Sequence, residues 1–312
     1  MTGAVYPSTM SPSSKFPTQS PLQRSSWLKF CLVGVLWGIP YLLIKVAIAP
    51  NAFTPVFLVF ARVVIGSAIL IPYSIRRGKL KATRQYLGWI FIYALLEICG
   101  PWLLIGSAEQ KIPSGLAGLL VATVPFWATI LMAFLGDKTA LAPKRLAGMA
   151  IGFIGVTLVV GLESIRGHQN IGAILLILLA TLGYVAGPTL MSRKAPGLDG
   201  AAINAIAMAI SAVLYLPLAI KDFPHHHISA HAIESVAALG IFPTAMAFAL
   251  YFSVMADFGP ARASLVTYPN TAIAVVLGII FLNEPLTLGI VLGLPLVLVG
   301  SYFASRKPVA KN

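Results

Sequence analysis

The sequence predicts an all-α integral membrane protein with ten transmembrane helices, arranged as two inverted five-helix repeats around a central cavity. The first observation is composition: 58% of the residues are hydrophobic and only 10% are charged, whereas soluble domains are about a quarter charged. The second is that the chain between Trp27 and Ser305 divides into apolar runs of about 20 residues, the length that spans a bilayer. The third is a repeat of sequence features in the second half.

The expected helices follow the apolar runs, and the short connections between them favour antiparallel neighbours. They cover residues 28–49, 53–75, 87–107, 113–135, 145–162, 170–190, 200–220, 233–255, 263–282 and 286–304. Residues 1–27 are rich in Ser, Pro and Thr and predict a disordered cytoplasmic tail. They lack the basic start and apolar stretch of a signal peptide, so the first helix is expected to stay as an anchor. Residues 305–312 form a second expected cytoplasmic tail.

The basic residues alternate between the two sides of this layout. With the N-terminus inside, 17 of the 22 Lys and Arg fall in inner segments and three fall in outer loops, while Lys45 and Arg62 lie within helices. Cytoplasmic loops carry an excess of Lys and Arg, so both termini are predicted to be cytoplasmic, in a multi-pass protein of the cytoplasmic (inner) membrane. The net charge of +13 is dispersed among short loops and does not indicate nucleic-acid binding.

The two halves repeat the same order of features. The run Ala117–Pro125 aligns without a gap to Ala261–Pro269, and an acidic residue, Asp137 or Glu284, closes each segment. Because each half holds five helices, an odd number, the second half enters the membrane upside down. Inverted repeats of this kind are a recurring build of secondary transporters, with the solute site near the midplane between them.

Several motifs occur in an order typical of one family. They are Trp37-Gly38 with Lys45, Arg62 in the second helix, the prolines Pro125 and Pro269, and Asn283–Thr287 before the last helix. With these motifs the chain resembles the EamA-like transporters of the drug/metabolite transporter superfamily, over residues 28–304. The resemblance implies a first EamA-type repeat at 28–162 and a second at 170–304. The first half departs from the pattern at Asp137, where Glu is usual.

The resemblance also implies how the helices are used. The first four helices of each half would line a central cavity, while the fifth and tenth would lie at the periphery, often at a contact between two copies in a homodimer. The expected partners are a small organic solute and membrane lipid. The family includes exporters and importers of amino acids, metabolites and drugs, so the resemblance fixes neither the solute nor the direction.

Glu97 is the most informative single residue. It lies close to the middle of the expected helix 87–107, where a carboxylate is costly unless it is protonated, paired or in contact with water. One interpretation is a site that couples a proton to transport or binds a substrate amine. The other is a neutral carboxyl group that hydrogen bonds to a neighbouring helix.

Two basic side chains share the membrane region with Glu97. Arg62 lies at about the same depth on the second helix and keeps its charge, so it either binds a substrate carboxylate, neutralises Glu97 or has a structural or gating role. Lys45 lies roughly 10 Å outward of the midplane, from a rise of about 1.5 Å per residue. It either contacts the solute or extends to the outer surface.

Prolines and aromatic residues complete the expected cavity. Pro125 and Pro269 recur at matching positions of the repeat, and proline bends a helix, so they predict a gate, a cavity wall or a packing kink. Polar contacts are expected from two neighbours of Pro269, and an aromatic wall for an apolar or cationic solute from five further residues. These candidates are Tyr268 and Asn270, and Trp37, Trp102, Trp127, Tyr184 and Tyr251. Taken singly, each aromatic also fits packing or interfacial anchoring.

The remaining polar residues do not predict a metal site, and no cofactor is expected. Cys31 and Cys99 lie inside apolar runs, without the spacing of a disulfide framework or a metal site. The cluster His225–His227 with His231 sits in an outer loop and lacks firmly spaced Cys or carboxylate partners. Asp137 and Glu284 lie at helix ends, where capping and interaction with the helix dipole are expected.

The predicted function is a secondary transporter that moves a small organic solute, with export of an amino acid or related metabolite as the favoured case. The sequence lacks a Walker A motif, so ATP is not expected to drive it. A membrane-embedded sensor or assembly protein remains an alternative. An intramembrane enzyme is a weaker one, because every histidine falls in an expected outer loop.

Overall fold

A computed structural model describes residues 21–137, 141–165, 170–258 and 263–305, and these are helical without any strand. Most of the expected tail 1–27 and all but the first residue of the tail 305–312 lie outside the described residues. Seven helices in the described part are long and apolar enough to cross a membrane, and Thr267–Leu282 and Leu288–Ala304 are shorter apolar helices. The protein is therefore an all-α, multi-pass membrane protein.

The helices fall at each of the ranges expected from hydropathy. In the first half they are α1 Pro21–Gly38, α2 Pro40–Ala47, α3 Pro55–Arg76, η1 Lys81–Tyr86, α4 Leu87–Tyr93, η2 Ala94–Cys99, α5 Gly100–Glu109, α6 Ser114–Val121, α7 Val124–Phe134 and α8 Pro143–Ile165. In the second half they are α9 Ile171–Lys194, α10 Gly200–Lys221, α11 Ala230–Leu239, η4 Gly240–Met246, α12 Ala247–Phe258, η5 Ser264–Val266, α14 Thr267–Leu282 and α15 Leu288–Ser305. Helix α1 begins at Pro21, within the expected disordered tail, because proline suits the first turn of a helix.

Local sequence explains where these helices begin. Thr54, Asn170, Asp199 and Ser229 each precede a helix, and the side chain of each accepts a hydrogen bond from a backbone N–H in the first turn. Such caps satisfy amide groups that have no partner within the helix. Polar residues between apolar runs thus set the helix boundaries.

Proline accompanies the breaks in two expected helices. The first expected helix is divided between α1 and α2, just before Pro40, and the fourth between α6 and α7, just before Pro125. Pro269 occupies the first turn of α14, after the short helix η5. A proline ring fits the first turn of a helix but not its interior, so both repeat prolines follow an interruption rather than kinking a continuous helix.

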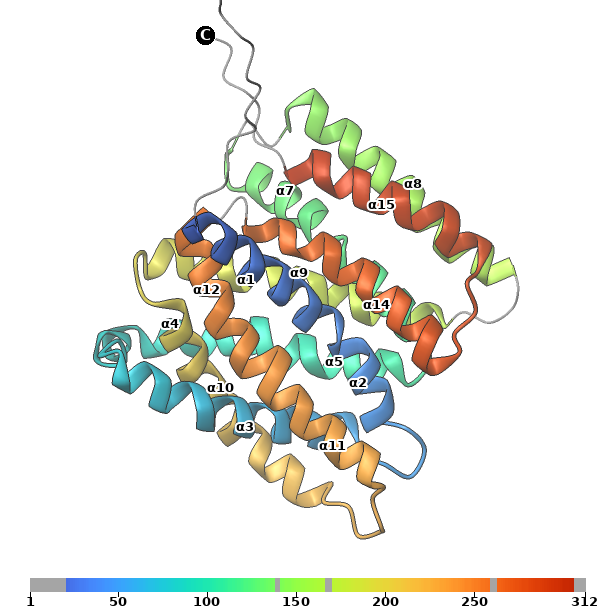
Figure 1. Ribbon diagram of the computed structural model, residues 1–312. Coiled ribbons are helices and arrows are strands. Elements are labelled where there is room, and N and C mark those ends of the chain that lie inside the picture. The colour runs from blue at the N-terminus through green and yellow to red at the C-terminus, as the bar shows by residue number, and fades with distance from the viewer. Residues whose placement is uncertain (1–20, 138–140, 166–169, 259–262, 306–312) are drawn as a thin grey trace, which may run out of the picture.

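Helices α8 and α15 pack side by side at one edge of the bundle (Figure 1). Four glycines bring their backbones together, and a Cβ atom added at Gly155 would lie 2.8 Å from the carbonyl oxygen of Gly293. Small residues permit such close approach between membrane helices. The pair therefore packs closely together beside the helices that build the cavity, and Ser301 of α15 donates to the carbonyl of Ala122 at 2.7 Å.

Glycines also hold α14 against α1 and α6. A Cβ atom at Gly34 would contact the Pro269 ring at 3.0 Å, and one at Gly118 would meet the Ala274 side chain at 2.6 Å. The Thr271 hydroxyl donates to the carbonyl of Gly118 at 3.4 Å. The expected fourth and ninth helices are thus in direct contact, and both contribute residues to the cavity described next.

Candidate functional site

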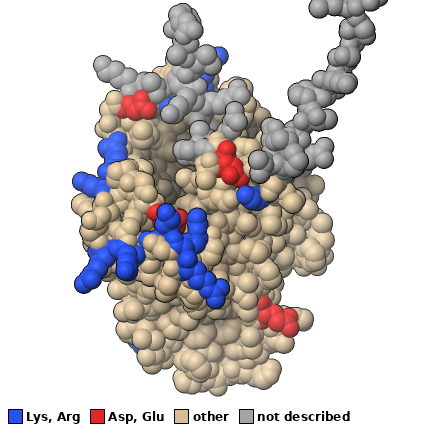
Figure 2. Space-filling model, turned by 60° about the vertical axis from the view of Figure 1, so that its left-hand side comes forward, with Lys and Arg blue, Asp and Glu red and all other residues tan. Residues whose placement is uncertain are grey.

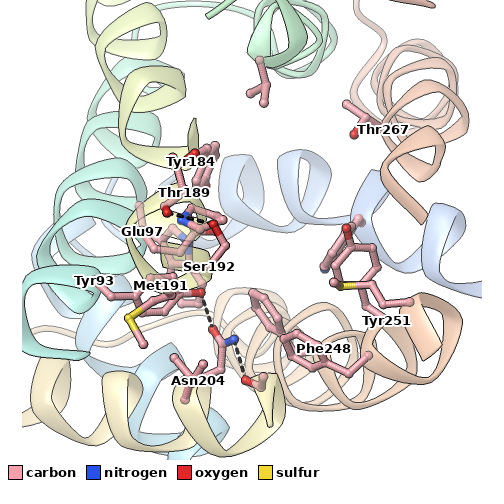
Figure 3. A pocket seen from close by; sticks show the side chains of 18 of the residues that line it. Tyr93, Glu97, Tyr184, Thr189, Met191, Ser192, Asn204, Phe248, Tyr251 and Thr267 are labelled. Carbon is pink, nitrogen blue, oxygen red and sulfur yellow. Dashed lines mark hydrogen bonds between the residues drawn. The ribbon is translucent and has the colours of Figure 1, made fainter. Parts of the chain in front are cut away.

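A cavity of about 780 Å³ lies inside the bundle, lined by helices from both halves of the chain (Figure 3). Its lining runs from the exposed Ser192, Pro196 and Gly197, at the turn between α9 and α10, to the buried Ile44 and Ile105. We call the first region the mouth and the second the deep end. A cavity of this size accommodates a small organic molecule.

Aromatic side chains form much of the wall. Trp37, Trp102, Tyr184 and Tyr251 line the cavity as expected from the sequence, and so does Asn270. Further aromatic and polar residues that the sequence did not single out also line it: Tyr41, Tyr93, Phe248, Phe252 and Asn204. The Tyr93 hydroxyl donates to the side-chain oxygen of Asn204 at 3.1 Å (Figure 3).

Two expected lining residues are outside the cavity. Tyr268 packs its ring against Tyr302 of α15, with centroids 6.3 Å apart, because it lies on a different face of α14 from Thr267 and Asn270. Trp127 lies one turn beyond Val124, the last lining residue of α7. Trp127 and Tyr268 are therefore not among the residues that line this cavity.

Glu97 projects into the cavity from η2, a π-helical segment (Figure 3). The side chain is half-buried, yet its Oε2 atom is buried without a hydrogen-bond partner in the described part of the chain. Gly187 of α9 lies opposite, and a Cβ atom there would come 3.2 Å from that oxygen. The carboxyl group is thus confined between two helices while facing the cavity, and it is available to a proton or to a cationic group.

Arg62 is buried in the cavity wall and does not pair with Glu97. Its Nε donates to the hydroxyl of Thr244 at 2.7 Å, and its guanidinium carbon lies 3.6 Å from the centre of the Trp102 ring. No Arg62–Glu97 ion pair occurs within 4.0 Å in the described residues. The guanidinium is therefore held by a hydrogen bond and an aromatic face. No carboxylate of the described residues neutralises its positive charge, so an anionic group of a solute could pair with it.

Both charged candidates depend on π-helical segments that sequence reasoning missed. Glu97 lies in η2, and Thr244, the partner of Arg62, lies in η4, which occupies the corresponding helix of the second half. Such segments are rare and often mark functional sites. The available signal was proline, because Pro101 follows η2 and Pro243 lies within η4, and each removes a backbone donor.

Lys45 is not among the residues that line the cavity, and it is partly buried. Its ammonium group donates to the backbone carbonyls of Glu109 and Ile112, the latter at 2.9 Å. These carbonyls close the end of α5, where a cation offsets the helix dipole. The ammonium group of Lys45 is therefore engaged by the carbonyls at this helix end.

Glu284 caps a helix, as expected, but the helix belongs to the other half. Its two carboxylate oxygens accept hydrogen bonds from the backbone amides of Ser114, at 2.6 Å, and Gly115, at 2.9 Å. The negative charge thus sits at the positive end of α6. Asp137 follows the end of α7.

No group of three metal-binding side chains occurs in the described ranges. His231 approaches Glu234 at 3.7 Å, and both side chains are exposed. The histidine loop therefore offers no assembled site there.

Polar contacts surround the mouth of the cavity. On one side Lys29 of α1 donates to Ser253 at 2.9 Å and pairs with Asp257 of α12 at 3.3 Å. On another, Arg77 pairs with Asp199, just before α10, at 3.7 Å. Lys and Arg side chains gather on part of the face drawn in Figure 2, whereas the lower part of that face carries few charges. Arg193 and Lys194, which follow the mouth residue Ser192, are exposed, so the mouth lies beside basic side chains.

We expect Arg62→Lys to lower the free energy of unfolding by about 1–3 kcal/mol, because lysine loses both the Nε hydrogen bond and the stack on Trp102. The check is the thermal unfolding midpoint of the purified protein in detergent. Arg76→Lys, at an exposed position of the same helix, is the control. Equal midpoints for the two variants would show that the Arg62 contacts do not stabilise the fold.

Comparison with known proteins identifies the architecture. A model of the EamA-like transporter family matches residues 25–161 and again residues 171–306. The chain is 27% identical over 288 residues to the uncharacterized inner membrane transporter YedA of Escherichia coli (strain K12), covering 88% of this chain and 91% of that protein. It is 24% identical over 301 residues to the uncharacterized transporter YvbV of Bacillus subtilis (strain 168), covering 94% and 95%.

A solved structure, described only as a crystal structure of a protein, has the same fold. It superposes with a TM-score of 0.65 and 20% sequence identity, over 90% of this chain and 96% of that one. The family match extends over most of the sequence, including the helices that build the cavity. This multi-pass membrane protein therefore belongs to the EamA-like transporter family.

Proposed function

We propose that the protein is a secondary transporter that moves a small organic solute across the cytoplasmic membrane by alternating access. The observation that carries this proposal is the cavity, which reaches from its mouth deep between the two halves and contains Glu97 with a carboxyl oxygen that has no partner in the described residues. A fixed site that is reached first from one side and then from the other is the usual arrangement of such transporters.

The proposed layout is ten membrane-spanning helices in two inverted repeats, with both termini in the cytoplasm. The double family match and the corresponding positions of η2 and η4 support two repeats. The distribution of Lys and Arg supports the orientation. In this orientation the mouth faces the cytoplasm and the deep end lies toward the outside, as an exporter requires when it loads its solute.

A labelling experiment tests the orientation. Single cysteines placed between Ser74 and Arg84 are expected to react with an impermeant reagent only from the cytoplasmic side, and those placed between Pro224 and Ser229 only from outside. The reason is that positively charged loops stay in the cytoplasm during insertion. If one side labelled both sets, the ten-span arrangement would have to be abandoned.

The cavity chemistry favours an amino acid or a related metabolite as the solute. Glu97 offers a carboxyl group for an amine, and Arg62 retains donors for a carboxylate beyond its bond to Thr244. The aromatic wall provides an apolar surface for a side chain. The direction in this proposal is export.

Transport into proteoliposomes with a panel of labelled solutes tests the function. We expect accumulation or exchange of at least one amino acid or small metabolite, with empty liposomes as the control and unlabelled solute as competitor. A sensor, an assembly protein or an enzyme would give no protein-dependent flux for any member of the panel. Conversion of a solute without its movement would favour the enzyme.

A further inference from the structure

A second acidic side chain, Glu109, lies buried outside the cavity lining. It is the last residue of α5 and has no exposed surface. Neither of its carboxyl oxygens has a hydrogen-bond partner in the described part of the chain. A buried carboxylate without a partner is costly.

The surroundings of Glu109 join three parts of the bundle. Lys45 of α2 donates to the backbone carbonyls of Glu109 and Ile112, and Glu284, after α14, caps the start of α6 at Ser114. The hydroxyl of Ser114 is also buried without a partner in the described residues. Polar groups from α2, α5, α6 and the α14–α15 connection therefore meet at one place.

Other titratable and charged groups lie on the elements around Glu109. Lys45 and Tyr41 lie on α2, Arg62 on α3, Tyr184 on α9, and Glu284 in the α14–α15 connection. Among these, the ammonium of Lys45 is bonded to the Glu109 backbone itself. It is therefore the nearest cation available to a charged Glu109 side chain.

This cluster stands between the cavity and the end of the bundle away from the mouth. Ile105, one helical turn before Glu109, lines the deep end, and Ile44, next to Lys45, lines it as well. The same end carries the α2–α3 and α10–α11 connections, which are joined by a hydrogen bond of 3.1 Å from Thr54 to Asp222. For the deep end to open, α2 must separate from the junction of α5 and α6.

We propose that Glu109 is a proton-binding site that controls the opening of the deep end. With its proton, Glu109 stays buried, and Lys45 holds α2 to the carbonyls at the end of α5. When the proton leaves to water, the carboxylate attracts the Lys45 ammonium, which releases the carbonyl of Ile112. Lys45 then ties α2 to α5 alone, the hydrogen bond from α2 to the α5–α6 connection is lost, and water reaches the cavity between α2 and α6.

The inference rests on the proposed function in one respect, namely that the deep end of the cavity opens during transport. It does not depend on the identity of the solute or on the role of Glu97. A labelling assay without solute therefore tests it separately. Ile105→Cys, in a background with Cys31→Ser and Cys99→Ala, reports opening through reaction with an impermeant thiol reagent added outside. His226→Cys, in the exposed α10–α11 connection, corrects for the effect of pH on thiol reactivity.

The corrected labelling of Ile105→Cys is expected to rise at least about fivefold between about pH 5.5 and about pH 8.5. Adding Glu109→Gln should keep labelling low at both pH values, because glutamine resembles the protonated acid. Adding Glu109→Asp should retain a response to pH. Glu234→Gln, at an exposed carboxylate of the α11 helix, is the matched control and should behave as the parent.

Two results would overturn the proposal. One is a parent protein whose corrected labelling does not change with pH, and the other is a Glu109→Gln variant that keeps the full response. If Glu109→Gln fails to fold, Lys45→Gln provides the second measurement, with high labelling expected at both pH values because the link to the carbonyls is gone. Persistently low labelling of Lys45→Gln would equally count against the proposal. The labelling assay contains no solute, so its results can be interpreted even if no member of the solute panel is transported.

Discussion

Replacing Glu97 by glutamine is expected to abolish the dependence of transport on a pH gradient while solute exchange stays measurable. Glu97 faces the cavity with a buried, unpartnered oxygen, so its proton can be exchanged with whichever side the cavity is open to. Glutamine keeps the shape of the protonated side chain but cannot release a proton. The gradient-driven component should therefore fall by about tenfold or more, which corresponds to at least about 1.4 kcal/mol.

The measurement is solute flux into proteoliposomes with and without an imposed pH gradient. Glu234→Gln removes an exposed carboxylate and should leave the gradient dependence intact. If Glu97→Gln transports with its full pH dependence, the proton-coupling role is wrong. Glu97 would then be a structural residue of the η2–α9 contact.

The largest effect on folding is expected from Gly300→Leu, which should lower the free energy of unfolding by about 3 kcal/mol. A Cβ atom at Gly300 would lie 2.6 Å from the carbonyl oxygen of Gly148, so backbone rather than a flexible side chain blocks it. The α8–α15 pair would have to separate to admit the leucine. The thermal unfolding midpoint in detergent reports the loss.

Gly88→Leu provides the control for this substitution. Gly88 lies in α4, and an added Cβ atom there meets nothing within 4 Å. We expect an unchanged or slightly higher midpoint, because leucine favours helix more than glycine does. Equal destabilisation by the two substitutions would mean that close packing of α8 and α15 does not hold this part of the fold.

Hydropathy was enough to predict an all-α membrane protein and the apolar runs that form its helices, because length and apolarity of a membrane helix are set by the bilayer. It also singled out Glu97 and Arg62, since a charge within an apolar run is conspicuous. It did not predict the breaks between α1 and α2 and between α6 and α7. Hydropathy did not predict how Glu97 and Arg62 lie relative to each other, or which residues hold each side chain in place. Arg62 depends on Thr244, which lies far along the chain in a π-helical segment.

Glu109 shows why contacts between distant segments could not be predicted from the sequence. It comes just after the end of the expected helix 87–107, where an acidic residue normally faces water. Its backbone carbonyl accepts a hydrogen bond from Lys45, and Glu284 caps the helix that begins a few residues later, and both partners lie at distant positions in the sequence. Contacts with distant segments also decide where Lys45 and Tyr268 lie, at the end of α5 and against Tyr302 of α15.

The size of the cavity has a consequence for selectivity. At about 780 Å³ it lies in the upper part of the range that encloses drug-sized ligands, so an amino acid fills only a fraction of it. Such a solute would enter with part of its hydration shell, and water would complete the contacts that the wall leaves open. Discrimination among solutes would then depend on charge and hydrogen bonding far more than on volume, and solutes of different size would share one pathway.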